Sequence, residues 1–136
     1  MKRALLLAVV SAVGLSGTAY AHHSFAASYF ENQHVTLKGE MVSFDFKNPH
    51  AIVHLMVPDT FGNRIEYTAE WAGATRLQAQ GVSNDTLKIG DYLVIAGAPA
   101  RDPDQHRVHL KSIQRPADGW TWSGGYGPPQ AYGRRR

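Results

Sequence analysis

Histidine is the residue type in this sequence best suited to chemistry. The chain has seven histidines and no cysteine, which excludes disulfides and thiolate metal sites and leaves imidazole sites open. His22 and His23 directly follow Ala19-Tyr20-Ala21, and His50 and His54 lie in and just after an Asn-Pro-His sequence. These four histidines are the candidate ligands of a metal ion.

Metal binding by His22 and His23 depends on removal of the residues that precede them. Met1-Lys2-Arg3 comes before an apolar run over residues 4–15, and Ala19-Tyr20-Ala21 follows it. This order of basic, apolar and small residues is typical of a secretory signal peptide over residues 1–21, cleaved after Ala21. As a helix the run would span only about 18 Å, against roughly 30 Å for the hydrocarbon core, which disfavours a retained membrane anchor. We therefore predict export to the periplasm, with no transmembrane segment in the mature chain.

A histidine at the mature N-terminus can hold a metal with two of its own nitrogens. The free amine and Nδ1 of His22 would form a chelate. An imidazole from His23, or from a neighbour in the fold, would complete a T-shaped set of nitrogens suited to copper. The prediction depends on cleavage at that one bond.

The second pair lies on a predicted strand. His50, Ile52, His54 and Met56 have the same parity, so they point to the same face. His50 and His54 would be about 13 Å apart in an extended chain, and one ion could bind both only through a bend or a further ligand. The thioether of Met56 would favour copper(I). The alternative is that Ile52 and Met56 pack while the histidines make ordinary hydrogen bonds.

The remaining ionisable residues give no catalytic pattern. His106 and His109 have opposite parity in the last predicted strand, which argues against a shared site, and His34 is expected at the surface. Glu66 and Glu70 would be about 13 Å apart, too far for the carboxylate pair of a retaining glycosidase. Because no nucleophile beside a base and no phosphate loop is present either, we predict a non-catalytic protein.

The distribution of charge excludes a nucleic-acid partner. Of the 14 basic residues, two lie in the predicted leader and three end the chain, leaving nine against 11 acidic residues over residues 22–133. A nucleic-acid-binding domain carries a basic face on its folded body, and this body is slightly acidic.

Alternating apolar residues predict the strands that must position the histidines. The first strand covers residues 35–46, and its alternation changes phase between Met41 and Val42, which requires a bend or bulge. Further strands are expected over 51–57, 64–71, 92–97 and 106–113, with a helix over 74–80. This order predicts an all-β fold: a small five-stranded OB-fold-like barrel with one short helix between strands 3 and 4. A β-sandwich usually needs about seven strands.

The composition divides the mature chain into two parts. Residues 22–115 form the predicted barrel domain. From residue 116 glycine and proline dominate, with interspersed aromatics and three terminal arginines, and residues 116–136 are expected to form a flexible tail.

Several short motifs resemble a family of small, functionally uncharacterised bacterial periplasmic proteins. They are His22-His23-Ser24-Phe25, Val35-Thr36-Leu37-Lys38-Gly39, Asn48-Pro49-His50-Ala51 and Leu87-Lys88-Ile89-Gly90-Asp91. The resemblance covers most of residues 22–100 and implies periplasmic location and fold type, with no activity to transfer. Members of the family end near the fifth strand, so the extension over residues 120–136 departs from the pattern.

Two functions remain open at this stage. The first is a metal-binding module, with copper favoured, that uses His22 with His23, His50 or His54. The second is a non-catalytic OB-like adaptor that binds a small ligand or an envelope protein.

Overall fold

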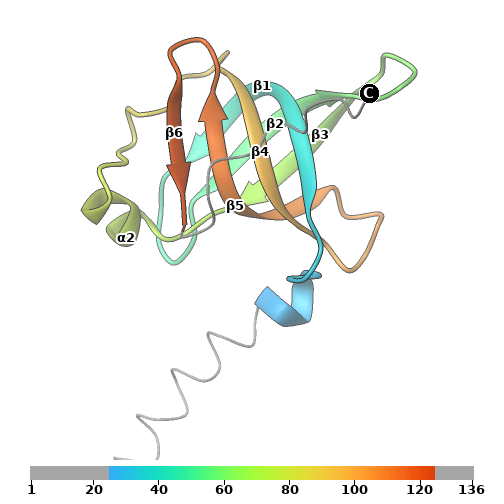
Figure 1. Cartoon of the computed structure of the whole chain (residues 1–136), viewed down its shortest axis with the longest axis horizontal. Helices are drawn as coiled ribbons and strands as arrows, with labels where there is room; N and C mark the ends of the chain where they lie inside the picture. The colour runs from blue at the N-terminus through green and yellow to red at the C-terminus, as the bar shows by residue number, and fades with distance from the viewer. Residues whose placement is uncertain (1–24, 125–136) are drawn as a thin grey trace, which may run out of the picture.

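Strands form where the apolar residues alternate. The computed structural model describes residues 25–124, and Figure 1 shows them rolled into a barrel of strands with a short helix at one side. The strands are β1 (Val35–Asp45), β2 (Ile52–Pro58), β3 (Arg64–Glu70), β4 (Tyr92–Pro99), β5 (Arg107–Arg115) and β6 (Trp120–Ser123). Helix α2 (Ala74–Ala79) lies between β3 and β4, as predicted.

The sheet closes on itself through one parallel contact. The strand order is β3-β2-β1-β4-β5-β6, with antiparallel neighbours throughout and an additional pairing of β3 with β5. This closing contact consists of the three pairs Thr68–Arg107, Ala69–Val108 and Glu70–His109. We call it the barrel seam. Closure of five strands confirms the predicted all-β, OB-fold-like barrel.

The phase change in the first strand corresponds to a bulge. The register of β1 against β2 shifts between Met41 and Ser43, the position at which the alternation of apolar residues reverses. Residues 35–40 pair with β4 on one edge, and residues 40, 41 and 43–45 pair with β2 on the other edge. The bulge therefore lets one strand serve both sides of the barrel, as its sequence predicted.

Apolar side chains of alternating strand positions fill the barrel. Val53, Leu55, Ala69 and Trp71 are completely buried, and Ile113 of β5 joins them. Full burial of each large apolar side chain contributes about 1.5–3 kcal/mol. The opposite parity leaves Glu66, Glu70, His54 and their neighbours on the outer surface of the barrel.

A sixth strand occupies part of the expected tail. The composition of residues 116–136 predicts a flexible tail, but Trp120–Ser123 form β6 and pair with β5. The indole of Trp122 packs edge-on against Trp71 with 4.9 Å between ring centroids, and its Nε1 donates to Gln80 Oε1 at 3.0 Å. The two tryptophans thus hold this segment against the barrel and beside the end of α2. Residues 125–136 lie outside the described residues.

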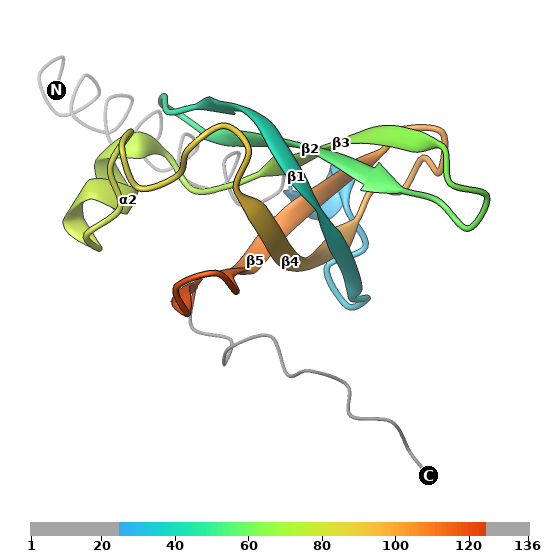
Figure 2. The same cartoon turned by 90° about the horizontal axis from the view of Figure 1, so that it is seen from above.

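The segment before β1 lies across the outside of the barrel. Residues 25–28 form one helical turn, drawn in blue in Figure 1 near the start of β1. The next residue, Tyr29, bridges to Ala100 and is 1% exposed. We call residues 25–34 the N-terminal arm. Figure 2 shows that α2 and the β2–β3 hairpin lie at opposite ends of the molecule.

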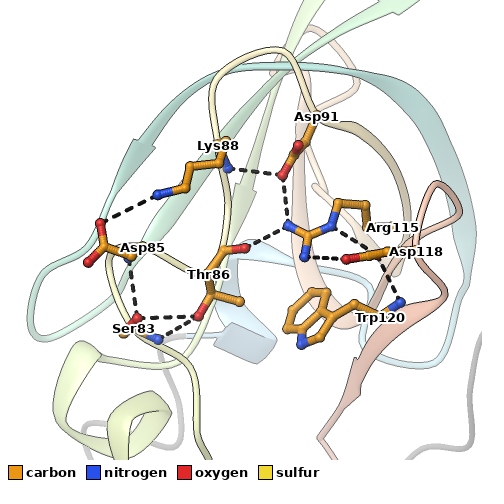
Figure 3. Close-up of polar contacts among 8 residues, drawn as sticks. All are labelled: Ser83, Asp85, Thr86, Lys88, Asp91, Arg115, Asp118 and Trp120. Carbon is orange, nitrogen blue, oxygen red and sulfur yellow. Dashed lines mark hydrogen bonds and ion pairs between the residues drawn. The ribbon is translucent and has the colours of Figure 1, made fainter.

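A cluster of ion pairs around Arg115 fastens the loop before β4 to the β5–β6 turn. Figure 3 shows the Arg115 guanidinium between Asp91, Asp118 and the Thr86 carbonyl. Both carboxylates lie 2.9 Å from it, and these hydrogen bonds, to Asp118 first and Asp91 second, raise the pKa of Arg115 above its ordinary value. The Arg115 cluster, meaning these four residues, therefore joins two loops that no strand pairing connects.

Candidate functional site

A cavity of about 950 Å³ opens on the outside of the barrel beside the seam. The N-terminal arm, the loop before β2, the start of α2, β5 and β6 all contribute to its walls. Its polar side chains include His50, His109, Glu31 and Lys111, and its aromatic side chains are Phe25, Trp71 and Trp122. This volume is within the range of small-molecule and cofactor sites.

The Asn-Pro-His loop reaches the cavity because it is fastened to α2. The Asn48 side chain accepts a hydrogen bond from the Thr75 amide at 3.2 Å, and the Ala74 amide donates to the Lys47 carbonyl at 3.1 Å. A Cβ at Gly73 would lie 2.5 Å from the Pro49 carbonyl oxygen, so only glycine allows this approach. The loop ends at His50, one wall of the cavity.

A chain of three charged or polar groups leads to the first imidazole. Nδ1 of His50 lies 2.7 Å from Glu70 Oε1. The other oxygen of Glu70 accepts hydrogen bonds from Arg107 at 3.1 Å and from the hydroxyl of Tyr29. Arg107, Glu70 and His50 form what we call the first relay. The seam places Glu70 two register pairs from Arg107, which brings the long arginine side chain within reach.

A second relay of the same composition lies beside the first. Nδ1 of His109 lies 2.7 Å from Glu31 Oε1, and the Lys111 ammonium donates to Glu31 Oε2 at 2.5 Å. His109 and Lys111 are alternate residues of β5, so they point to the same outer face, and Glu31 comes from the N-terminal arm. Each relay therefore runs from a cation through a carboxylate to an imidazole.

One phenyl ring contacts the imidazoles of both relays. Phe25 stacks on His109 with 3.8 Å between centroids and an angle of 9°, and it packs against His50 at 4.7 Å in a tilted orientation. Both imidazoles line the cavity. Within residues 25–124, no hydrogen bond engages Nε2 of His50 or His109. The structure thus brings two imidazoles, each held at Nδ1, to one place.

Burial and neighbouring charges set the ionisation of this region. Burial lowers the pKa of His109 below its usual value, which favours the neutral imidazole, although Glu31 partly opposes the shift. Burial alone would raise the pKa of Glu31, but hydrogen bonds from Lys111 and His109 hold it below its usual range. Burial and the hydrogen bond to Glu70 raise the pKa of Tyr29. Glu31 is therefore a carboxylate and Tyr29 a neutral donor near pH 7.

The four predicted ligands have different places in the structure. His50 lies in the cavity wall. His54 lies on the outer surface, where Nδ1 is 3.0 Å from Glu66 and Nε2 is 3.3 Å from Asp45. The structure does not bring His54 to the cavity, and both of its ring nitrogens already have carboxylate partners. His22 and His23 lie outside the described residues.

Sequence reasoning missed His109, Glu31 and Glu70 as parts of a site. The Glu70 side chain is 19% exposed and makes three polar contacts, with His50, Tyr29 and Arg107. The available signal was the alternation of Arg107, His109 and Lys111, which puts three cationic or imidazole side chains on one face of β5.

The described residues alone do not assemble a full coordination sphere. Residues 25–124 contain no group of three or more histidine, cysteine, aspartate or glutamate side chains arranged to hold a metal ion. No helix in that part of the chain is both long and apolar enough to cross a bilayer. The cavity therefore brings together two imidazoles, but within residues 25–124 it has no set of three such groups that could hold a metal ion.

Comparison with known proteins assigns the chain to a family. No curated protein and no solved structure matches it. A family described only as a family of unknown function, DUF6152, matches residues 9–109, which is most of the chain. This agrees with the resemblance drawn from the His-His-Ser-Phe and Asn-Pro-His motifs. The chain therefore belongs to the DUF6152 family of unknown function.

Proposed function

We propose that this protein is exported and binds a metal ion, with copper favoured, through His22 at its mature N-terminus and His50 in the cavity wall. The observation that carries the proposal is the state of His50: Glu70 holds its Nδ1, and its Nε2 has no hydrogen-bond partner within residues 25–124. Metal-binding histidines almost always have this arrangement, because the bond at one nitrogen fixes the tautomer and orients the other.

The N-terminal histidine lies within reach of this imidazole by chain length. Residue 22 precedes Phe25 by three residues, which span at most about 11 Å, and the Phe25 ring lies 4.7 Å from His50. The amine and Nδ1 of His22 supply two nitrogens, and Nε2 of His50 supplies a third. His23 is the alternative source of that third nitrogen. Nitrogen ligands in such a set suit copper(II).

Copper titration of the mature protein tests the proposal. Protein beginning at His22 is compared with protein carrying one additional glycine before it, which keeps every side chain but moves the free amine. We expect the extended protein to bind Cu²⁺ much more weakly, because the chelate ring cannot form. Circular dichroism of both proteins checks that the barrel is unchanged. Equal affinities would remove the proposal.

The export that this chemistry requires is a separate proposal with its own measurement. Mass spectrometry of the protein recovered from the periplasm of its host should give a chain that starts at His22. A chain that retains residues 1–21, or that starts at another residue, would contradict the N-terminal chelate, whatever metal the protein contains.

The second candidate function is a non-catalytic adaptor that binds a small ligand or an envelope protein. It is favoured by the aromatic wall of the cavity and by Trp71, whose buried Nε1 has no hydrogen-bond partner among the described residues. Under this alternative a chelator leaves binding unchanged, and Trp122→Ala weakens it. Loss of ligand binding on metal removal would favour the first function instead.

A further inference from the structure

The face of β5 that lines the cavity carries a second metal-ligand candidate that the sequence did not indicate. Arg107, His109 and Lys111 point outward at alternate positions, and the seam pairs His109 with Glu70, the residue that holds His50. The two relays therefore start from Arg107 and Lys111, four residues apart on the same strand, and both end in the cavity wall.

A carboxylate at Nδ1 determines the tautomer of His109, as it does for His50. A neutral imidazole has one N–H and one lone pair. With Nδ1 2.7 Å from the Glu31 carboxylate, the N–H is at Nδ1 and the lone pair is at Nε2. The Lys111 ammonium pairs with the Glu31 carboxylate, as the Arg107 guanidinium pairs with that of Glu70. In each relay the cation therefore secures the carboxylate, and the carboxylate orients the imidazole.

Two other histidines of the described residues, His54 and His106, have surroundings that do not suit a metal ligand in the cavity. His54 has a carboxylate at both nitrogens. His106 is exposed and packs on the ring of Tyr67 with 5.0 Å between ring centroids, and it does not line the cavity that contains His50 and His109. His50 and His109 each have one ring nitrogen bonded to a carboxylate and also line the cavity. His54 and His106 do not meet both conditions.

We propose that Nε2 of His109 is a further ligand of the metal ion that His22 and His50 bind. The inference rests on the proposed function above and adds one imidazole to its ligand set, giving four nitrogens from three histidines. Because the Phe25 ring contacts both imidazoles, we expect this ring to shift when one ion engages them together.

Copper binding by single variants of the mature protein tests the inference. Cu²⁺ affinity is measured for His109→Gln and His50→Gln, with His54→Gln and His106→Gln as matched controls. We expect the first two to bind Cu²⁺ more than tenfold more weakly and both controls to match the unsubstituted protein. In electron paramagnetic resonance spectra, His109→Gln should remove the coupling of one imidazole nitrogen.

Glu31→Gln provides a second variant in case His109→Gln does not fold. It keeps the imidazole but removes the carboxylate that orients it, and loss of such a partner typically weakens metal binding 10–100-fold. Its spectrum should retain the number of coupled nitrogens, which separates an orienting role from ligation.

The outcomes distinguish this inference from the proposed function. If His109→Gln matches the unsubstituted protein in affinity and spectrum while the extra N-terminal glycine abolishes binding, the proposed function stands and the inference is wrong. If the glycine extension also has no effect, both are wrong. Weaker binding by the His106→Gln control would likewise overturn the assignment of His109.

Discussion

The Arg115 cluster and the two relays contain the same types of charged group but differ in which groups complete their hydrogen bonds. In the Arg115 cluster the guanidinium is matched by two carboxylates and a backbone carbonyl, and the network closes on itself (Figure 3). Each relay begins in the same way, with a cation on a carboxylate, but ends in an imidazole whose Nε2 has no hydrogen-bond partner within residues 25–124. The candidate site is therefore distinguished by imidazole nitrogens without a hydrogen-bond partner among these residues, and not by its charge.

The two regions also differ in what they connect. The Arg115 cluster joins two loops at one end of β5. The relays join the N-terminal arm, the loop before β2 and the seam, and they border a cavity. We therefore expect substitutions in the Arg115 cluster to change stability alone, and substitutions in the relays to change both stability and ligand binding.

The largest expected effect on stability is that of Arg115→Met. The Arg115 side chain is 16% exposed, and its loss leaves the 20%-exposed side chain of Asp91 without its cation. Breaking a largely buried pair costs up to 3–5 kcal/mol, and partial exposure reduces the expected loss to about 2 kcal/mol. Urea denaturation measures it.

Arg64→Met is the matched control for that change. Arg64 pairs with Glu40 at 3.6 Å with both side chains more than half exposed, so the free energy of unfolding should change by less than about 0.5 kcal/mol. Equal losses in the two variants would show that the Arg115 cluster is no more than a surface ion pair.

An intermediate effect is expected for Tyr29→Phe, a change beside the first relay rather than in it. The hydroxyl of this buried residue donates to Glu70 and accepts from Arg107. Removing it leaves Glu70 and Arg107 paired with each other, so the loss should be about 1 kcal/mol in free energy of unfolding. The same variant should retain copper binding, since His50 and Glu70 are untouched. A loss of binding larger than that of His50→Gln would contradict the relay as described.

The second relay predicts opposite shifts of one pKa. The positive charge of Lys111 lowers the pKa of His109 and the carboxylate of Glu31 raises it. Lys111→Met should therefore raise the midpoint of the His109 titration, and Glu31→Gln should lower it, as followed by the imidazole proton shifts in NMR spectra. Shifts of the same sign would contradict the geometry.

The same pKa gives the direction of a pH effect on stability. The folded pKa of His109 lies below the ordinary value of about 6.5, so the unfolded chain takes up the proton first. The contribution of this residue to stability is complete above pH 6.5 or so and is lost as the pH falls from there through the folded pKa. His109→Gln should remove that part of the pH dependence.

A small effect on stability is expected for His54→Gln. Both nitrogens of His54 pair with carboxylates on the partly exposed outer surface, and such pairs contribute up to about 1 kcal/mol. We expect a stability change below that value and unchanged copper binding. Weaker copper binding by this variant would restore His54 to the ligand set and place the metal away from the cavity.

Much of the fold could be predicted because its signals are local. The reversal of alternation at Met41 and Val42 predicted the bulge, and alternating apolar residues predicted the strands and the helix. β6 was missed because its three alternating residues, Trp120 to Trp122, stand in a segment rich in glycine and proline. Only packing against Trp71 and pairing with β5 identify it as a strand.

The candidate site was predicted only in part because its contacts are non-local. The Asn-Pro-His motif indicated His50, but the partners of a histidine depend on the register of neighbouring strands. Register gives His54 its two carboxylates and removes it from the cavity. The parallel seam brings His109 to Glu70, and no pattern within a single strand shows which strand lies beside it.

The seam is also the shortest joint of the barrel. Three residue pairs hold β3 to β5, whereas seven hold β2 to β3. Segments held by few backbone hydrogen bonds open more often than the rest of a protein. Transient opening there would move Glu70 away from His109 while the remaining sheet stays paired. Amide exchange near residues 107–109 should therefore be faster than in β2, and an ion bound by both imidazoles should slow it.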